Sequence, residues 1–185
     1  MIEEVKKACE VLRDGGIILY PTDTVWGIGC DATNKEAVEK IYRLKRRTDR
    51  KSMLVLVDGP SRLETYVDNI PDIAWQLIEV ADAPLTIIYD KGRNLASNLM
   101  EGDGSIGIRV TGEAFSRALC ERFNKPVVST SANISGEPSP SCYADISPSI
   151  VDGVDYAVNY RRDERSAAPS SIIRLGAGGL FEIIR

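Results

Sequence analysis

Histidine is absent from this chain of 185 residues. Its absence removes the commonest general base and the commonest transition-metal ligand, and it excludes Ser-His-Asp and Cys-His mechanisms. The cysteines are far apart and form no C-x-x-C pair, which favours reduced thiols over disulfides or a metal site: Cys9, Cys30, Cys120 and Cys142. Chemistry must therefore rest on positioning, on charge stabilisation, on a carboxylate or on a base that the substrate carries.

Long apolar runs and a strong excess of one charge are also missing. No apolar segment approaches the roughly 20 residues that span a bilayer, and the N-terminus lacks the shape of a signal peptide. We therefore expect a cytoplasmic protein with no membrane partner. The net charge of −4 gives no global attraction to nucleic acid, so an anion site needs a local cluster of lysine and arginine. The length fits a single domain over residues 1–185.

The spacing of apolar residues predicts an α/β fold. Helical spacing is found in the segments 5–12, 37–44, 71–81 and 112–123, and Asn34 is typical of an N-cap. Strand patterns are found in the segments 17–20, 53–57, 84–89, 105–110, 126–129, 154–158, 171–175 and 180–184. Residues 22–29 and 136–148 are expected to be loops. Strands alternate with helices at first and the chain ends in strands, which predicts an open α/β or α+β sheet.

Two segments contain cations that suit an anionic ligand. Six of the ten residues from Tyr42 to Lys51 are basic. Such a run is either a solvated helix end or a phosphate or RNA contact. Arg109 ends an apolar strand, and a buried arginine needs an anion because its desolvation is costly.

Two further segments are rich in small polar residues. Segment 20–29 presents a Thr-Asp-Thr sequence where a strand ends, and segment 126–138 follows another strand with Ser-Thr-Ser-Ala-Asn. These side chains can bind ribose, phosphate or a hydroxyl-bearing substrate, or they can stabilise ordinary turns. Each segment alone leaves both interpretations open.

Taken in order, the four segments resemble the YrdC-type threonylcarbamoyl-adenylate synthase family over nearly the whole chain. The matching segments are Tyr20–Gly29 (its opening loop), Lys45–Arg47 (K-x-R), Ala83–Thr86, Gly107–Arg109, Ser129–Gly136 (S-x-N) and Pro169–Ile173. The resemblance implies a twisted open mixed sheet with flanking helices and a basic concave face. The chain departs from the family pattern in the proline-free loop from Lys45 to Ser52, and at Leu56, where many members have a histidine.

The resemblance also implies a reaction. L-Threonine and bicarbonate or CO2 give N-carboxythreonine, which attacks the α-phosphate of ATP and releases pyrophosphate. This step needs positioning and charge neutralisation but no protein nucleophile, which suits a chain without histidine. Mg²⁺ would accompany the nucleotide, with no protein side chain as a metal ligand. A separate transferase complex would then pass the threonylcarbamoyl group to tRNA.

Site residues follow from the same resemblance. Lys45 and Arg47 are the expected catalytic residues, whereas Arg43, Arg46 and Arg50 are expected to be surface charge. Threonine would contact Thr24, Arg109, Ser129 and Ser170, with Arg109 on its carboxylate. ATP would contact Lys45, Arg47, Lys51, Ser105, Ser131, Asn133, Ser139 and Arg185. We expect the Ser170 hydroxyl to be exposed at a strand end, so that its loss costs little stability.

Other interpretations stay open at this point. The same basic face could bind double-stranded RNA or tRNA without catalysis. A related carbamoyl-transfer enzyme is a second alternative, although such modules usually belong to longer chains with zinc-finger-like cysteines. The strand 171–175 could also merely complete the edge of the sheet. Threonine-dependent release of pyrophosphate would separate the enzyme from the binding module.

Overall fold

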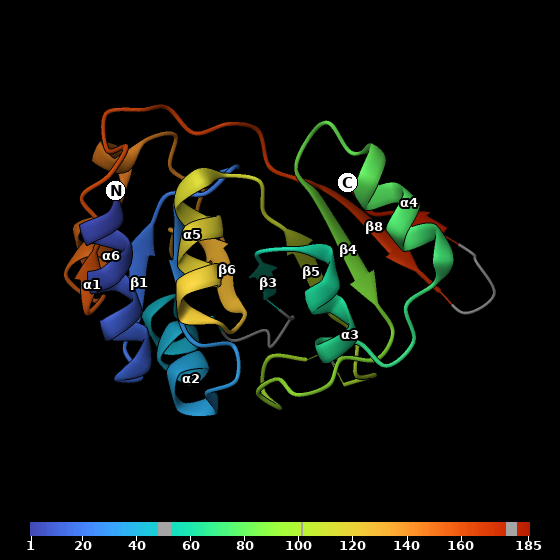
Figure 1. Cartoon of the computed structure of the whole chain (residues 1–185). Coiled ribbons are helices and arrows are strands. Elements are labelled where there is room, and N and C mark those ends of the chain that lie inside the picture. Colours follow the sequence, from blue (N-terminus) through green and yellow to red (C-terminus); the bar gives the residue numbers. More distant parts are fainter. Residues whose placement is uncertain (48–52, 101, 177–180) are drawn as a thin grey trace.

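A nine-stranded mixed sheet organises the described residues, which are 1–47, 53–100, 102–176 and 181–185 of the computed structural model (Figure 1). The strand order is β7-β1-β2-β6-β3-β5-β4-β8-β9. The strands are β1 Ile18–Tyr20, β2 Gly27–Gly29, β3 Leu54–Val57, β4 Leu85–Tyr89, β5 Ile106–Val110, β6 Val127–Ser131, β7 Tyr156–Ala157, β8 Ser171–Leu175 and β9 Phe181–Ile183. The pairs β1–β7, β3–β5 and β4–β8 are parallel and the others are antiparallel, which confirms the predicted open mixed sheet.

The four predicted helices are present, together with two short ones. The helices are α1 Ile2–Arg13, α2 Lys35–Leu44, α3 Leu63–Tyr66, α4 Asp72–Val80, α5 Ala114–Phe123 and α6 Pro148–Val151, with 3₁₀ turns at Pro60–Arg62 and Tyr143–Asp145. Asn34 caps α2 as predicted, because its side chain accepts a hydrogen bond from Ala37 N at 3.0 Å. None of the helices in the described parts of the chain is long and apolar enough to cross a membrane.

The prediction of a loop over residues 22–29 is wrong for its last part. Residues 27–29 form β2, which pairs antiparallel with β1 and with β6. In the sequence Gly-Ile-Gly only the isoleucine has a side chain, so the alternation of apolar and polar residues that indicates a strand cannot be recognised there. Close packing explains the glycines: a Cβ at Gly29 would lie 2.7 Å from Val128 O and 2.6 Å from Tyr20 Cε1. The loop predicted over 136–148 likewise contains a 3₁₀ turn, and α6 begins at its last residue.

Two apolar clusters lie on opposite faces of the sheet. Val55 and Val57 of β3 belong to the larger cluster with α2, whereas Leu56 between them belongs to a cluster with α1 and α5. Figure 1 shows α5 in front of β6. Because paired residues share a face, the pairs Leu56–Arg109 and Leu54–Ser129 place Arg109 and Ser129 on the face that α1 and α5 cover in part. Arg109 and Ser129 thus lie on the part of this sheet face that α1 and α5 leave uncovered.

Candidate functional site

A pocket of about 200 Å³ opens on this face of the sheet. Its walls come from the loop after β1, from β2, from the end of α2, from β3, β5 and β6, and from the two ends of the β8–β9 pair. Most of the predicted site residues line it: Thr24, Arg47, Arg109, Ser129, Ser131, Ser139, Ser170 and Arg185. The fold therefore brings together side chains that are up to 161 positions apart in the chain, from Thr24 to Arg185. No acidic side chain is among the described residues that line this pocket.

Arg109 is the most deeply buried cation of the pocket, with 2% of its side chain exposed. Its Nη2 atom lies 2.9 Å from Asp23 Oδ1 and donates to Thr24 Oγ1 over a long 3.4 Å. The ion pair is poorly aligned for a hydrogen bond, since Asp23 Oδ1 accepts none and Arg109 Nε donates none within the described chain. A guanidinium has five N–H donors, so Arg109 has capacity for a further anion.

Burial makes the charged forms of Asp23 and Arg109 less favourable. Desolvation lowers the pKa of Arg109, and the nearby Asp23 carboxylate opposes this shift. Desolvation also raises the pKa of Asp23, against the attraction of Arg109. Each group thus depends on the other to stay charged in the fold. Sequence reasoning noted the Thr-Asp-Thr segment but gave Asp23 no role, because its partner is 86 residues further along the chain.

Lys45 lies beside the pocket rather than in its lining. It is 3% exposed at the C-cap of α2, and its Nζ donates to the carbonyl oxygens of Ser131 and Asn133, the latter at 2.7 Å. Burial lowers the pKa of Lys45 to about 8, and the charge of Arg47 adds to this effect. The ammonium group therefore holds the end of β6, where Ser131 lies, and the turn that follows it. Arg43 and Arg46 are exposed, as expected for surface charge.

Asn133 is also next to the pocket and shapes the same turn. Its Nδ2 donates to the carbonyl oxygens of Ile134 at 2.9 Å and Glu137 at 2.7 Å. Its Oδ1 is buried and accepts no hydrogen bond from any described residue. An amide fixed in this way keeps one acceptor available for a donor that enters from outside.

The expectation of an exposed Ser170 hydroxyl is wrong. Ser170 is 3% exposed, its hydroxyl is hydrogen-bonded to Thr86 Oγ1 at 2.9 Å, and its carbonyl accepts from Arg185 Nε at 3.1 Å. Thr86 belongs to β4, the parallel neighbour of β8, so the strand pairing places a buried hydroxyl directly beside Ser170. Strand-end position alone could not reveal this neighbour.

One predicted nucleotide contact, Ser105, lies away from the pocket. Ser105 is 1% exposed, receives a hydrogen bond from Arg174 Nη2 at 2.9 Å and does not line the pocket. It shares a sheet face with Arg109, about 13 Å away at the usual rise per strand residue, and Gly107 lies between them. Lys51 and Arg50 lie outside the described residues. Leu56 is fully buried in the cluster with α1 and α5.

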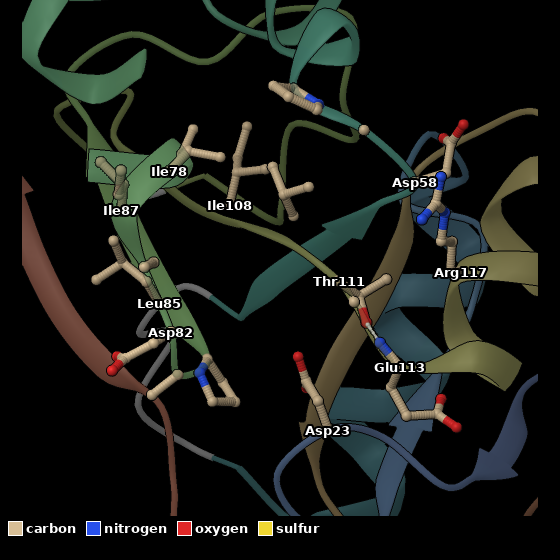
Figure 2. Close-up of a pocket in the computed structure, with 17 residues that line it drawn as sticks. Asp23, Asp58, Ile78, Asp82, Leu85, Ile87, Ile108, Thr111, Glu113 and Arg117 are labelled. Carbon is tan, nitrogen blue, oxygen red and sulfur yellow. Dashed lines mark hydrogen bonds between the residues drawn. The ribbon is translucent and has the colours of Figure 1, made fainter. Parts of the chain in front are cut away.

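A second pocket, of about 440 Å³, lies on the far side of Asp23 (Figure 2). Figure 2 shows an apolar wall with Ile78, Leu85, Ile87 and Ile108 on one side, and Asp23 across from it. Two acidic groups at its rim are engaged locally: Glu113 caps α5 and pairs with Arg161, and Asp58 pairs with Arg62. The larger pocket thus combines acidic side chains with Arg117, whereas the smaller pocket has Arg47, Arg109 and Arg185 with no acidic side chain among its described lining.

The fold and the smaller pocket define an α/β protein with a pocket lined by arginines and hydroxyls on an open sheet face. The chain belongs to the Sua5/YciO/YrdC family, because that family's model, described as "Telomere recombination", matches residues 10–185. The match extends over both halves of the sheet and every segment that lines the pocket.

Individual relatives agree with this assignment. A threonylcarbamoyl-AMP synthase of Psychromonas ingrahamii is 38% identical over 136 residues, which is 71% of each chain. A threonylcarbamoyl-AMP synthase of Hydrogenovibrio crunogenus is 33% identical over 138 residues, or 72% of this chain and 74% of that protein. The crystal structure of P. abyssi Sua5 complexed with L-threonine is similar in fold, with a TM-score of 0.81 and 23% identity. That match covers 92% of this chain, which spans half of the Sua5 chain.

Proposed function

We propose that this protein is a threonylcarbamoyl-AMP synthase, which forms threonylcarbamoyl-AMP and pyrophosphate from L-threonine, bicarbonate or CO2, and ATP. The observation that carries the proposal is Arg109: a buried guanidinium with spare donors at the end of a pocket whose described lining has further arginines and hydroxyls but no acidic side chain. Such a site favours anionic ligands, and the reaction joins an amino-acid carboxylate to a nucleotide. The identity of the curated relatives supports the same activity.

In this proposal threonine occupies the Arg109 end of the pocket. Its carboxylate pairs with the free N–H groups of Arg109, while the hydroxyls of Thr24, Ser129 and Ser170 surround the rest of the molecule. A site that hydrogen-bonds a substrate hydroxyl rejects an analogue without that group far better than it rejects one that differs by a methyl. Threonine is therefore preferred strongly over 2-aminobutyrate and more weakly over serine.

ATP occupies the remainder of the pocket. Arg47 and Arg185 neutralise its phosphates, and Ser131 and Ser139 offer hydroxyls to them. Lys45 and Asn133 contribute by fixing the turn that follows Ser131, and the Asn133 Oδ1 atom stays available to the nucleotide. Ser105, which is buried on the same sheet face beyond Gly107, is a further proposed contact of the nucleotide. Lys51 is a further proposed contact.

Mg²⁺ fits this site as part of the nucleotide complex. Within the described residues no group of three or more acidic or cysteine side chains could hold a metal ion, and no acidic side chain lines the pocket. The triphosphate would supply the oxygen ligands, with the hydroxyls of Ser131 and Ser139 at hand. The ion would then add to the neutralisation of the leaving pyrophosphate.

The product requires a consumer, and we propose a transferase complex that passes the threonylcarbamoyl group to an adenosine of tRNA in the cytoplasm. Direct binding of double-stranded RNA or tRNA to the basic residues at the end of α2 is the alternative function, favoured by the exposure of Arg43 and Arg46. Catalysis and RNA contact use different side chains of the same segment, so substitutions can separate them.

Pyrophosphate release tests the proposal. We expect release that depends on threonine and on bicarbonate. Lys45→Met should lower the rate at least tenfold, which is about 1.4 kcal/mol of transition-state stabilisation. Arg43→Met is the matched control, since Arg43 is 78% exposed and pairs with Glu39 on the surface. Equal losses in both variants, together with equal losses of RNA affinity, would contradict the enzyme and favour the RNA-binding module.

A further inference from the structure

The loop after β1 contains a hydroxyl pair whose hydrogen-bond direction can be assigned from its partners. Thr22 Oγ1 lies 2.7 Å from the carbonyl oxygen of Val25 and 3.0 Å from Thr24 Oγ1, and it receives the Thr24 amide at 3.1 Å. Thr22 and Thr24 are each 6% exposed, so water does not compete freely for these bonds. The arrangement is therefore a closed local network rather than a solvated turn.

The single hydroxyl hydrogen of Thr22 determines the direction of the Thr22–Thr24 hydrogen bond. A hydroxyl has one hydrogen and two lone pairs. A carbonyl oxygen cannot donate, so the hydrogen of Thr22 goes to Val25 O. Thr22 must then accept from both the amide and the hydroxyl of Thr24, which fills its two lone pairs. The hydroxyl hydrogen of Thr24 is consequently donated to Thr22 Oγ1. Thr24 Oγ1 can therefore act only as an acceptor toward its other neighbours.

Those lone pairs face Arg109 and the pocket. Arg109 Nη2 is 3.4 Å from Thr24 Oγ1, a distance near the limit of a hydrogen bond, and Thr24 lines the smaller pocket. An acceptor beside a guanidinium suits a ligand that carries a donor next to its carboxylate. In an α-amino acid that donor is the ammonium group, which is attached to the carbon bearing the carboxylate.

We propose that Thr22 is a positioning and specificity-determining residue, which makes Thr24 a fixed hydrogen-bond acceptor for the α-ammonium group of the amino-acid substrate. This inference rests on the proposed function and adds to it the group of the substrate that Thr24 recognises. Thr22 lines a separate pocket of about 110 Å³ rather than the pocket that contains Arg109, and it acts on the substrate through Thr24. Without the Thr22 hydroxyl, Thr24 is free to rotate and donate, and the site loses its preference for an amino acid over a hydroxy acid.

Binding of two ligands to two variants of Thr22 tests the proposal. The ligands are L-threonine and (R)-3-hydroxybutyrate, which has the same skeleton without the amine. Thr22→Val keeps the shape and removes the hydroxyl, and Thr22→Ser keeps the hydroxyl. We expect Thr22→Val to weaken threonine at least tenfold by calorimetry and to change the competitive binding of (R)-3-hydroxybutyrate less than twofold. Thr22→Ser should retain the ratio of the two affinities, for L-threonine and for (R)-3-hydroxybutyrate, that the natural protein has.

Thr24→Val tests the same bond from its other end. It should reproduce the loss seen in Thr22→Val, and the double variant should be little worse than either, since both remove one interaction. This cycle decides the matter even if (R)-3-hydroxybutyrate binds too weakly to measure. Equal weakening of both ligands, additive losses, or a Thr22→Ser variant as poor as Thr22→Val would overturn the role of Thr22 alone. A natural protein that binds no threonine would overturn the proposed function as well.

Discussion

Replacing Arg109 by methionine should damage both stability and threonine binding. The side chain is 2% exposed and its partner Asp23 is 12% exposed, so the substitution leaves a buried carboxylate without its ion pair. Breaking a buried pair from one side costs about 3–5 kcal/mol. For a chain of this length, each kcal/mol lowers Tm by about 2–4 °C, so we expect a loss of roughly 6–20 °C. Thermal unfolding measures it directly.

The loss of thermal stability in the Arg109→Met variant should depend on pH. Burial already raises the pKa of Asp23, and without Arg109 nothing comparable opposes that shift. A group whose folded-state pKa is raised stabilises the fold when it is protonated and loses this contribution as the pH rises through the folded pKa. The Tm deficit relative to the natural protein should therefore be smaller at pH 5 than at pH 8.

A second substitution separates the two effects. Asp23→Asn in the Arg109→Met background removes the buried charge and should recover much of the Tm, while threonine affinity stays low. Arg117→Met is a matched control, because Arg117 is 58% exposed and pairs with Glu121 on the surface, where such pairs contribute about 0–1 kcal/mol. A Tm deficit that is equal at both pH values, or no deficit at all, would refute the buried pair.

Three further variants follow from the contacts of the pocket. Burial lowers the pKa of Lys45 to about 8, so the rate of pyrophosphate release should fall as the pH rises through that value and the ammonium group loses its proton. In Lys45→Arg this decrease in rate should occur at a higher pH. An unchanged pH–rate profile would contradict a role for this charge. Ser170→Ala should weaken threonine and destabilise the fold by about 1–3 kcal/mol, because Thr86 loses its partner, and adding Thr86→Val should restore the Tm but not the affinity. Arg185→Ala should weaken ATP binding, more strongly at low salt because ions screen an exposed charge; a salt-independent loss by calorimetry would argue against a phosphate contact.

Much of the fold could be predicted because most of its strands are apolar runs with clear ends. β3 and β5 are examples, with buried aliphatic side chains that leave an unmistakable pattern. β2 could not be found in this way, since Gly27 and Gly29 contribute no side chain to the pattern. That strand exists because the backbones of β1 and β6 approach closely on both sides, which is a property of the assembled sheet.

Most of the predicted site residues line the smaller pocket, but their contacts could not be predicted from the sequence. The resemblance pointed to Arg109 and Thr24, and the structure places both in one pocket. The ion pair of Arg109 with Asp23 and the bond of Ser170 with Thr86 join segments more than 80 positions apart, and no local pattern encodes such pairs. The direction of the Thr22–Thr24 bond needs three partners in space, so it also emerges only from the folded chain.

The most direct test of the account is to identify the product. The protein is incubated with ATP, Mg²⁺, bicarbonate and isotopically labelled L-threonine, and the nucleotides are analysed by mass spectrometry. The account predicts an adenylate that carries the threonine label and one carbon from bicarbonate, formed together with pyrophosphate and absent when threonine is omitted or Arg109 is replaced. ATP turnover without a labelled adenylate, or no turnover while RNA is bound tightly, would contradict it.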